Sequence, residues 1–309
     1  MILVTGGNGF IGKAILAAYG DATVSLTRRP DGTIGQAAGQ TKRAQVQSHI
    51  TFDLTRSDLA QELARQLEPL RITEIIHTAA VTPWSKDPDF SLDAHMAKTV
   101  TQVCNLLHIP RLTFLSGWIV YDMHGDGPFD ESTPLGPTIP YGKSKLASER
   151  YFATHLRGTK AVNLRLASLY GPGQTSPGLI PNFVKTALAG EPLTVGAVKA
   201  RRDYLYIDDL LDSLKRLSEV DIVQHMDLNL GSGQAVTVED VAKTIQEICG
   251  ELDLKPVQVK YQEQMKEAVP LTNGLDIAKA QSLGLLRRTT DLHDGLLAYI
   301  TWRKDQDER

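Results

Sequence analysis

The stretch PYGKSK contains the pair of residues in this chain best suited to acid–base chemistry, Tyr141 and Lys145. They are four residues apart, so a helix would place them on one face. A lysine ammonium beside a phenol favours the phenolate and lowers the tyrosine pKa from about 10 toward neutrality. Such a phenol can exchange a proton with a hydroxyl or a carbonyl group. Because the chain has nine tyrosines, this spacing also arises by chance, and only its position in the fold gives it meaning.

A second group of interest lies in FLSGWIVYD, where Ser116 and Gly117 interrupt an apolar strand. A hydroxyl there, about 25 residues before Tyr141, could give a hydrogen bond to the reacting oxygen. The alternative is that Ser116 only caps a turn, because serine readily bonds to nearby backbone groups. The sequence leaves both interpretations open.

The segment VTGGNGFIG places glycines at 6, 9 and 12 between an N-terminal strand and a helix expected from Gly12 to about Tyr19. Glycines allow the backbone to approach a pyrophosphate closely, and the free N–H groups of the helix N-terminus can hold it. A plain strand-to-helix connection would use similar residues. The strand before the glycines and the helix after them favour dinucleotide binding.

The choice between NAD and NADP is expected at the end of the second strand, where an acid would bind the ribose and an arginine would bind a 2'-phosphate. This strand ends with Thr27-Arg28-Arg29 and has no acid, which favours NADP and leaves NAD possible. Both arginines could instead be solvated loop residues. Asp53, after the third strand, could either accept the adenine amino group or cap a helix.

The elements that must position these residues alternate between short apolar strands and helices through the first half of the chain. This order predicts an α/β fold with a doubly wound, parallel Rossmann sheet and a smaller C-terminal α/β lobe that binds substrate. The Gly- and Pro-rich stretch at 171–178 indicates the crossing into that lobe. We expect the dinucleotide-binding domain to comprise 1–170 with about 203–232, and the substrate lobe 171–202 with 233–309.

The composition excludes other classes of protein. Hydrophobic residues make up 42% of the 309, charged residues 22%, and the net charge is -3, so no basic excess exists to bind nucleic acid. Cys104 and Cys249 form neither a metal-binding motif nor a disulfide framework. A strand directly after Met1 and the lack of an apolar run of about 18 residues predict a cytoplasmic protein that does not contact a membrane.

Seven motifs occur in order between residues 5 and 233: TGGNGFIG, HTAA, FLSGWIVYD, PYGKSK, LYGPG, RRDYLYIDD and NLGSG. Together they resemble the extended short-chain dehydrogenase/reductase family of NAD(P)-dependent nucleotide-sugar epimerases, dehydratases and ketoreductases. The resemblance implies that Tyr141 is the acid/base and that Lys145 binds the ribose while tuning Tyr141. It also implies that the pyrophosphate contacts Gly6, Gly9 and Gly12, and that Phe10 and Ile11 belong to the same cofactor site. Asp53 and Leu54 would border the adenine, and Ala79 and Ala80 the nicotinamide ribose. The implied substrate residues are Thr82, Asn182 and Arg202, the last facing a diphosphate.

Three departures from the family pattern affect the expected function. Gly117 stands where the family has its catalytic Ser or Thr, so Ser116 is one residue early. Trp118 and Ile119 replace the Asp-Glu pair of the dehydratases, which argues against dehydration. The stretch KEAV near Lys266 replaces an Arg-x-x-Asp element that contacts the nucleotide, so the nucleotide base stays open.

The expected function is therefore reduction of a nucleotide-activated keto-sugar, with Tyr141 supplying the proton. An epimerase that retains NAD is an alternative, and so is a reductase of a non-sugar ketone, although Arg202 argues against an uncharged substrate. A catalytically idle NADP-binding regulator is a further alternative because of Gly117. The resemblance also implies a homodimer through the helices that carry Tyr141 and residues 91–107, although an intrachain core would explain Val100, Val103 and Leu107 equally well.

Overall fold

The computed structural model describes residues 1–29, 46–122, 127–196, 200–262 and 272–307. The KEAV stretch lies outside these residues. The chain divides into two compact units. The first contains Met1–Asp122, Pro134–Arg165 and Glu219–Leu228, and the second Met123–Thr133, Leu166–Ser218 and Asn229–Arg309. Compared with the division expected from the sequence, residues 123–133, 166–170, 203–218 and 229–232 group with the second unit.

A seven-stranded sheet with the strand order β10-β6-β5-β4-β1-β2-β3 forms the centre of the first unit. The registered pairs β1–β2, β2–β3, β1–β4 and β4–β5 are all parallel. This confirms the doubly wound Rossmann fold. Its strands are β1 (Ile2–Thr5), β2 (Thr23–Thr27), β3 (Ser48–Thr51), β4 (Glu74–His77), β5 (Arg111–Gly117), β6 (Lys160–Leu166) and β10 (Met226–Leu230).

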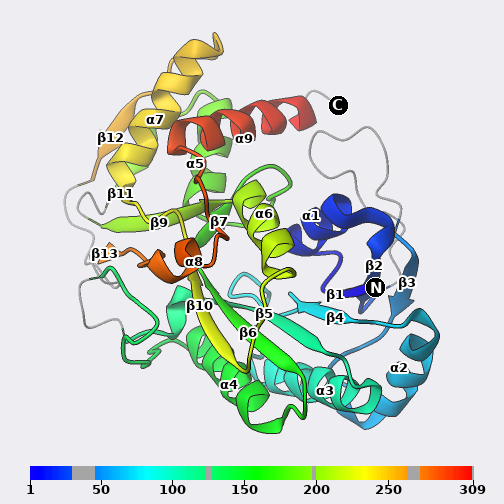
Figure 1. Ribbon diagram of the computed structural model, residues 1–309. Helices are drawn as coiled ribbons and strands as arrows, with labels where there is room; N and C mark the ends of the chain where they lie inside the picture. Colours follow the sequence, from blue (N-terminus) through cyan, green and yellow to red (C-terminus); the bar gives the residue numbers. More distant parts are fainter. Residues whose placement is uncertain (30–45, 123–126, 197–199, 263–271, 308–309) are drawn as a thin grey trace. The chain divides into compact units, whose positions relative to one another are not determined.

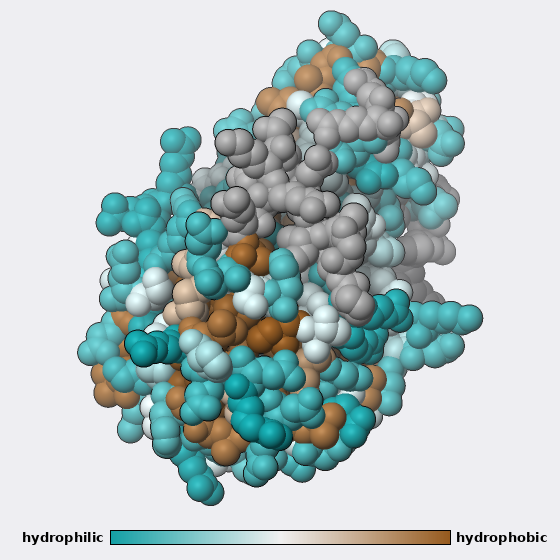
Figure 2. All heavy atoms as spheres, turned by 90° about the vertical axis from the view of Figure 1, so that its right-hand side faces the viewer, coloured by the Kyte–Doolittle hydropathy of each residue, from teal (hydrophilic) through white to brown (hydrophobic). Residues whose placement is uncertain are grey.

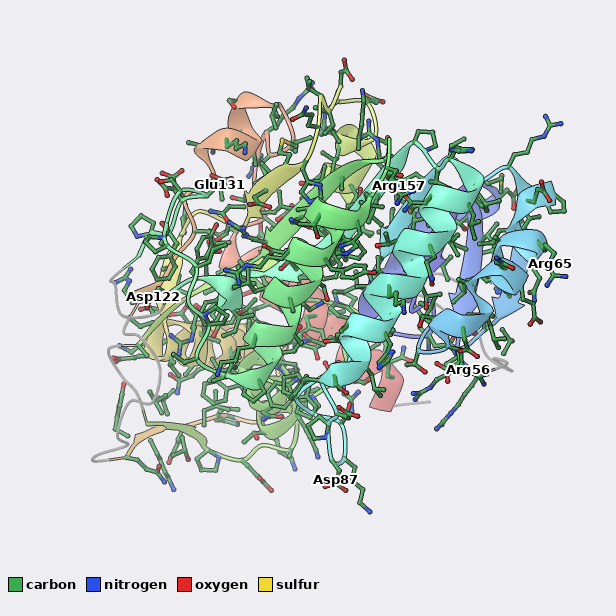
Figure 3. The ribbon with its side chains drawn as sticks, turned by 90° about the horizontal axis from the view of Figure 1, so that it is seen from below. Arg56, Arg65, Asp87, Asp122, Glu131 and Arg157 are labelled. Carbon is green, nitrogen blue, oxygen red and sulfur yellow. The ribbon has the colours of Figure 1, made fainter. Side chains whose placement is uncertain are left out.

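Helices cover both faces of this sheet, which explains why its strands are apolar without alternation. In Figure 1, α1 lies on one face, and α2, α3 and α4 lie on the other. Figure 3 shows α3 and α4 side by side. The helices of this unit are α1 (Phe10–Tyr19), α2 (Ala60–Leu67), α3 (Ser91–Leu107) and α4 (Pro140–His155), with short 3-10 turns η1 (Gly20–Ala22), η2 (Ser57–Leu59), η3 (Glu68–Leu70) and η4 (Trp118–Val120).

The core of the first unit lies between the sheet and these helices. Val100 and Val103 of α3 are fully buried in it, together with Leu112 and Phe114 of β5. The intrachain core thus accounts for the apolar spacing in α3 that could also have indicated a dimer surface. Hydrophilic residues cover most of the described surface on the face in Figure 2, and apolar residues form separate patches among them.

The second unit has a four-stranded sheet in which β9 pairs with β11, β13 and β7, and a separate β8–β12 pair. Its strands are β7 (Ser168–Tyr170), β8 (Leu193–Val195), β9 (Arg201–Tyr206), β11 (Ala235–Thr237), β12 (Val259–Tyr261) and β13 (Thr272–Asn273). Its helices are α5 (Leu179–Leu188), α6 (Ile207–Leu217), α7 (Val238–Glu251), α8 (Ala278–Ser282) and α9 (Leu292–Asp307). Buried Asp203 on β9 accepts hydrogen bonds from the backbone N–H and the hydroxyl of Ser232, and so joins β9 to the segment after β10.

Among the described residues, no helix has both the length and the apolar character that a membrane crossing requires. The same residues contain no cluster of three or more His, Cys, Asp or Glu side chains able to hold a metal ion.

Candidate functional site

Tyr141 and Lys145 lie in the first two turns of α4, as the sequence predicted. Pro140 begins the helix after Ile139, whose extended backbone ends the preceding loop. The Lys145 ammonium is buried and donates a 2.8 Å hydrogen bond to the carbonyl oxygen of Leu115 on β5. It lies 5.7 Å from the centre of the Tyr141 ring. The helix and the end of β5 therefore meet at this pair.

The pKa of Tyr141 does not follow the expectation from its spacing to Lys145. Burial raises the pKa of Tyr141 to about 12, and the negative charge of Asp93 acts in the same direction. The expected lowering is thus wrong for the protein alone, because desolvation disfavours the phenolate. Burial also lowers the pKa of Lys145 to about 8, against the opposing charges of Asp93 and Glu149.

Asp93 connects three segments around this pair, and the sequence did not single it out. One carboxylate oxygen accepts the N–H of Val81 at 2.8 Å, and the other accepts the hydroxyl of Ser144 at 2.7 Å. Asp93 is buried in the first turn of α3. An acid in the first turn of a helix is ordinarily explained by the helix dipole, so the sequence carried no distinctive signal.

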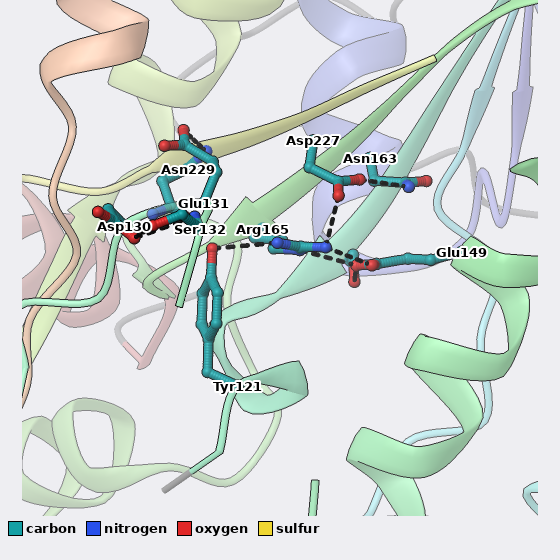
Figure 4. Close-up of polar contacts among 10 residues, drawn as sticks. Tyr121, Asp130, Glu131, Ser132, Glu149, Asn163, Arg165, Asp227 and Asn229 are labelled. Atoms are coloured by element: carbon teal, nitrogen blue, oxygen red, sulfur yellow. Dashed lines mark hydrogen bonds and ion pairs between the residues drawn. The ribbon is translucent and has the colours of Figure 1, made fainter. Parts of the chain in front are cut away.

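Ser116 lies near the end of β5 and is buried. Its hydroxyl donates a hydrogen bond to the carboxylate of Glu149, which lies one turn beyond Lys145 on α4. Arg165 of β6 holds the same carboxylate with two of its nitrogens (Figure 4). Glu149 could have been noticed in the sequence, because Tyr141, Lys145 and Glu149 follow at steps of four. Neighbouring Gly117 has an extended backbone and supplies no side chain.

The glycines of the first loop form a close-packed cradle. Gly6 has a left-handed backbone with φ of 69°, and a side chain there would strike Thr78 and the backbone of Ala79. A side chain on Gly12 would strike the carbonyl of Gly6 and the backbone of Gly7. Gly9 precedes α1 and provides no side-chain cap, so the first amides of the helix are left for a ligand. Phe10 and Ile11, both half-buried, form its first turn.

The ends of β1 and β4 are tied together beside this cradle. The hydroxyl of Thr5 accepts the N–H groups of Thr78 and Ala79, each at 3.2 Å, and lies 2.7 Å from the ring of His77. Burial lowers the pKa of His77 to about 3, with the charge of Lys145 acting in the same direction. Ala79 and Ala80 therefore lie half-buried next to the glycines, at the carboxyl edge of the sheet.

The remaining predicted residues of the first unit lie at the same edge of the sheet, in the segments that follow β2, β3 and β4. Arg28 and Arg29 are exposed at the end of β2. Asp53 accepts the N–H and hydroxyl of Thr55, so it closes a turn and does not cap α2, and Leu54 beside it is buried. Thr82 is exposed.

Two predicted substrate residues belong to the second unit. Asn182 is exposed on α5, and Arg202 is half-buried on β9, where it donates to the carbonyl of Arg201 at 3.0 Å.

Comparison with known proteins decides the family. A model of the NAD dependent epimerase/dehydratase family matches residues 2–231. The chain belongs to this family. The dTDP-4-dehydro-6-deoxyglucose reductase of Escherichia coli is 29% identical, over 96% of this chain and 95% of the relative. A putative UDP-glucose 4-epimerase of Methanocaldococcus jannaschii is 26% identical, over 99% of each chain. The structure of MoeE5 in complex with UDP-glucuronic acid and NAD is similar with a TM-score of 0.79 and 26% identity, over 99% of both chains.

Membership of the NAD-dependent epimerase/dehydratase family agrees with the geometry at the sheet edge. A side chain on Gly6 or Gly12 would fill the cradle, and the uncapped start of α1 offers amides to an anion. These features fit the pyrophosphate of a dinucleotide. The protein is an enzyme of this family, and the resemblance inferred from its motifs is confirmed.

Proposed function

We propose that the protein is an NAD(P)-dependent oxidoreductase that reduces a nucleotide-activated keto-sugar to the alcohol. The observation that carries the proposal is the connection through Asp93, which joins the segment after β4 to the helix of Tyr141. Because that segment begins with Thr78 and Ala79, beside the glycine cradle, the acid/base pair and the dinucleotide site share one edge of a parallel sheet. Ligands in such sheets bind beyond the carboxyl ends of the strands.

A bound dinucleotide would supply the hydride at C4 of its nicotinamide. Tyr141 would donate the proton to the carbonyl oxygen of the sugar, which a phenol protonated at neutral pH can do. The Lys145 ammonium would hold the ribose and stabilise the phenolate that proton transfer leaves. Gly6, Gly9 and Gly12 would hold the pyrophosphate, with Asp53 and Leu54 beside the adenine.

On the substrate side, the guanidinium of Arg202 would pair with a diphosphate, since its fork matches phosphate oxygens. Thr82 and Asn182 would contact the sugar and the nucleotide. Ser116 would accept a hydrogen bond from the hydroxyl of the alcohol product, because its own proton is donated to Glu149.

Two observations bear on the choice between reduction and epimerisation. The E. coli relative, at 29% identity, is a reductase of a dTDP-linked keto-sugar by its name. Exposed Arg28 and Arg29 favour NADPH, a reductant that is exchanged after each turnover. The second candidate is an epimerase that retains NAD, which the name of the M. jannaschii relative and the NAD in the MoeE5 structure support. The proposal also includes a cytoplasmic location and a homodimer. Gel filtration with light scattering tests the homodimer by measuring its molar mass.

The decisive experiment mixes the purified protein with NADPH and a panel of dTDP- and UDP-linked keto-sugars. Loss of the absorbance of reduced nicotinamide, matched by formation of the alcohol, is the expected result. No consumption of NADPH, with isomerisation of a parent UDP-sugar, would replace the proposal by epimerisation.

The matched variants are Tyr141→Phe and Tyr151→Phe, because both tyrosines lie on α4 and the ring of Tyr151 stacks on His155. Tyr141→Phe should lose turnover by about 10²-fold or more and keep its dinucleotide affinity. Tyr151→Phe should retain turnover. Equal activity of both variants would contradict the assignment of Tyr141 and favour a protein that binds a dinucleotide without this chemistry.

A further inference from the structure

Glu149 is a buried acid on the same helix as the proposed acid/base pair. It lies one turn beyond Lys145 and two turns beyond Tyr141, and only 3% of its side chain is exposed. A carboxylate in such a place needs hydrogen bonds or a cation, because its desolvation is otherwise prohibitive. The protein supplies both.

Arg165 provides the cation and is itself only 1% exposed. Its Nη2 donates to one oxygen of Glu149 at 2.9 Å, and its Nε donates to the other at 3.3 Å. The same Nη2 donates to Asp227 at 2.7 Å, and Nη1 donates to the hydroxyl of Tyr121 at 3.3 Å (Figure 4). This fork fixes Glu149 from strands β6 and β10. Burial raises the pKa of Glu149, and Arg165 and Ser116 oppose that rise.

The contact with Glu149 decides what the hydroxyl of Ser116 can offer. A serine hydroxyl has one proton to donate and two lone pairs to accept. Because the proton goes to Glu149, Ser116 keeps only its lone pairs for a ligand. It can therefore accept a hydrogen bond from a substrate hydroxyl but cannot donate one to a ketone.

Glu149 also acts on Lys145 through its charge. Burial alone would favour the neutral amine, and the carboxylates of Asp93 and Glu149 both raise the pKa of Lys145 against it. The charged or titratable groups around the ammonium are Tyr141 and Glu149 from α4, Asp93 from α3 and His77 from β4. His77 stays neutral near pH 7, so the two acids supply the negative charge.

We propose that Glu149, held by Arg165, is a positioning residue of this site. Its carboxylate accepts the hydrogen bond of Ser116 and stabilises the ammonium of Lys145, one helical turn away on α4. The inference rests on the proposed function only in assigning a ligand to Lys145. It predicts that Glu149 sets the pH range in which the protein binds a dinucleotide, although Glu149 itself touches none.

The test compares Glu149→Gln with Glu74→Gln. Glu74 is a matched control because it is also a buried acid. Like Glu149, it accepts a hydrogen bond from a hydroxyl on β5, in this case that of Thr113. It pairs with Arg111 at the beginning of β5, whereas Ser116 lies near the end. NADPH binding is titrated by fluorescence from about pH 6 to pH 10, a range that brackets the lowered pKa of Lys145.

In wild type, affinity should fall as Lys145 loses its proton near pH 8. Glu149→Gln should move this fall about one pH unit lower, which makes NADPH binding about tenfold weaker at pH values above both midpoints. Glu74→Gln should leave the midpoint in place. A Glu149→Gln midpoint that coincides with that of Glu74→Gln would overturn the proposal.

A second variant covers the case in which Glu149→Gln does not fold. Glu149→Gln combined with Arg165→Met removes both buried charges, and neutral replacement of a buried ion pair is often tolerated. It should show the same lowered midpoint, and an unmoved midpoint would equally overturn the proposal. Because the readout is dinucleotide binding, it gives a result even if wild type reduces no keto-sugar, which would count against the proposed function alone.

Discussion

The hydroxyl of Ser144 on α4 donates a 2.7 Å hydrogen bond to the carboxylate of Asp93 on α3. The other oxygen of that carboxylate holds the N–H of Val81, so one buried acid joins two helices and the segment after β4. The same charge raises the pKa of both Tyr141 and Lys145. Asp93 is therefore tied to the site through both structure and electrostatics.

Replacing Asp93 by asparagine should weaken the fold and the site together. The NH2 group of the asparagine would face a hydrogen-bond donor at the place where a carboxylate oxygen of Asp93 accepts a hydrogen bond. This should cost about 1 to 3 kcal/mol of unfolding free energy. Urea denaturation measures this loss. Asp89→Asn is the matched control, because Asp89 also accepts the N–H and hydroxyl of one residue, Ser91, but is exposed. A loss no greater than that of the control would show that the buried contacts of Asp93 are not important.

Replacing Gly12 by alanine should abolish dinucleotide binding. The new Cβ would strike the backbone of Gly6 and Gly7, which cannot move as a flexible side chain can. We expect a destabilisation of about 1 to 3 kcal/mol and no rise in melting temperature on adding NADPH. Gly250→Ala is the control, since Gly250 is in helix α7 with open space around it and should gain about 0.5 to 1 kcal/mol. Normal NADPH binding by Gly12→Ala would contradict the cradle.

Replacing Lys145 by methionine should stabilise the protein at neutral pH while impairing its function. Burial lowers the pKa of Lys145 from 10.5 to about 8, so the folded state binds its proton less tightly than the unfolded state does. This penalty is complete below pH 8 and disappears as the pH rises toward 10.5. The variant also loses the hydrogen bond to Leu115, so we expect a net gain of about 1 to 3 kcal/mol in the free energy of unfolding at pH 7.

Urea denaturation at several pH values measures this gain, which should shrink as the pH rises. Lys143→Met on the exposed side of the same helix should change little at any pH. A gain for Lys145→Met that is constant from pH 7 to pH 10 would show that the lysine proton is not its cause.

The parts of this site that could be predicted from the sequence are the local ones. The step of four between Tyr141 and Lys145 and the glycines between β1 and α1 depend only on neighbouring residues. Glu149 and Arg165 are 16 residues apart and meet only because β6 lies beside β5 under α4. The pKa of Tyr141 went against expectation for a related reason, because its desolvation depends on the tertiary fold. The residues proposed to bear chemistry were thus visible in the sequence. Of those that hold them in place, only Glu149 carried a signal, through its step of four from Lys145.

Replacing Arg28 and Arg29 by alanine tests which dinucleotide the protein prefers. The hydroxyl of Thr27 holds the carbonyl of Arg29 at 2.8 Å, which shapes the backbone directly after β2. Charged hydrogen bonds to a 2'-phosphate should make NADPH binding about 10- to 100-fold weaker in the double variant and leave NADH binding unchanged. Arg65→Ala, another exposed arginine of this unit on α2 (Figure 3), should affect neither. Titrations of both dinucleotides decide the matter. Equal loss of NADH and NADPH affinity would mean that the arginines act on overall charge and do not select NADP.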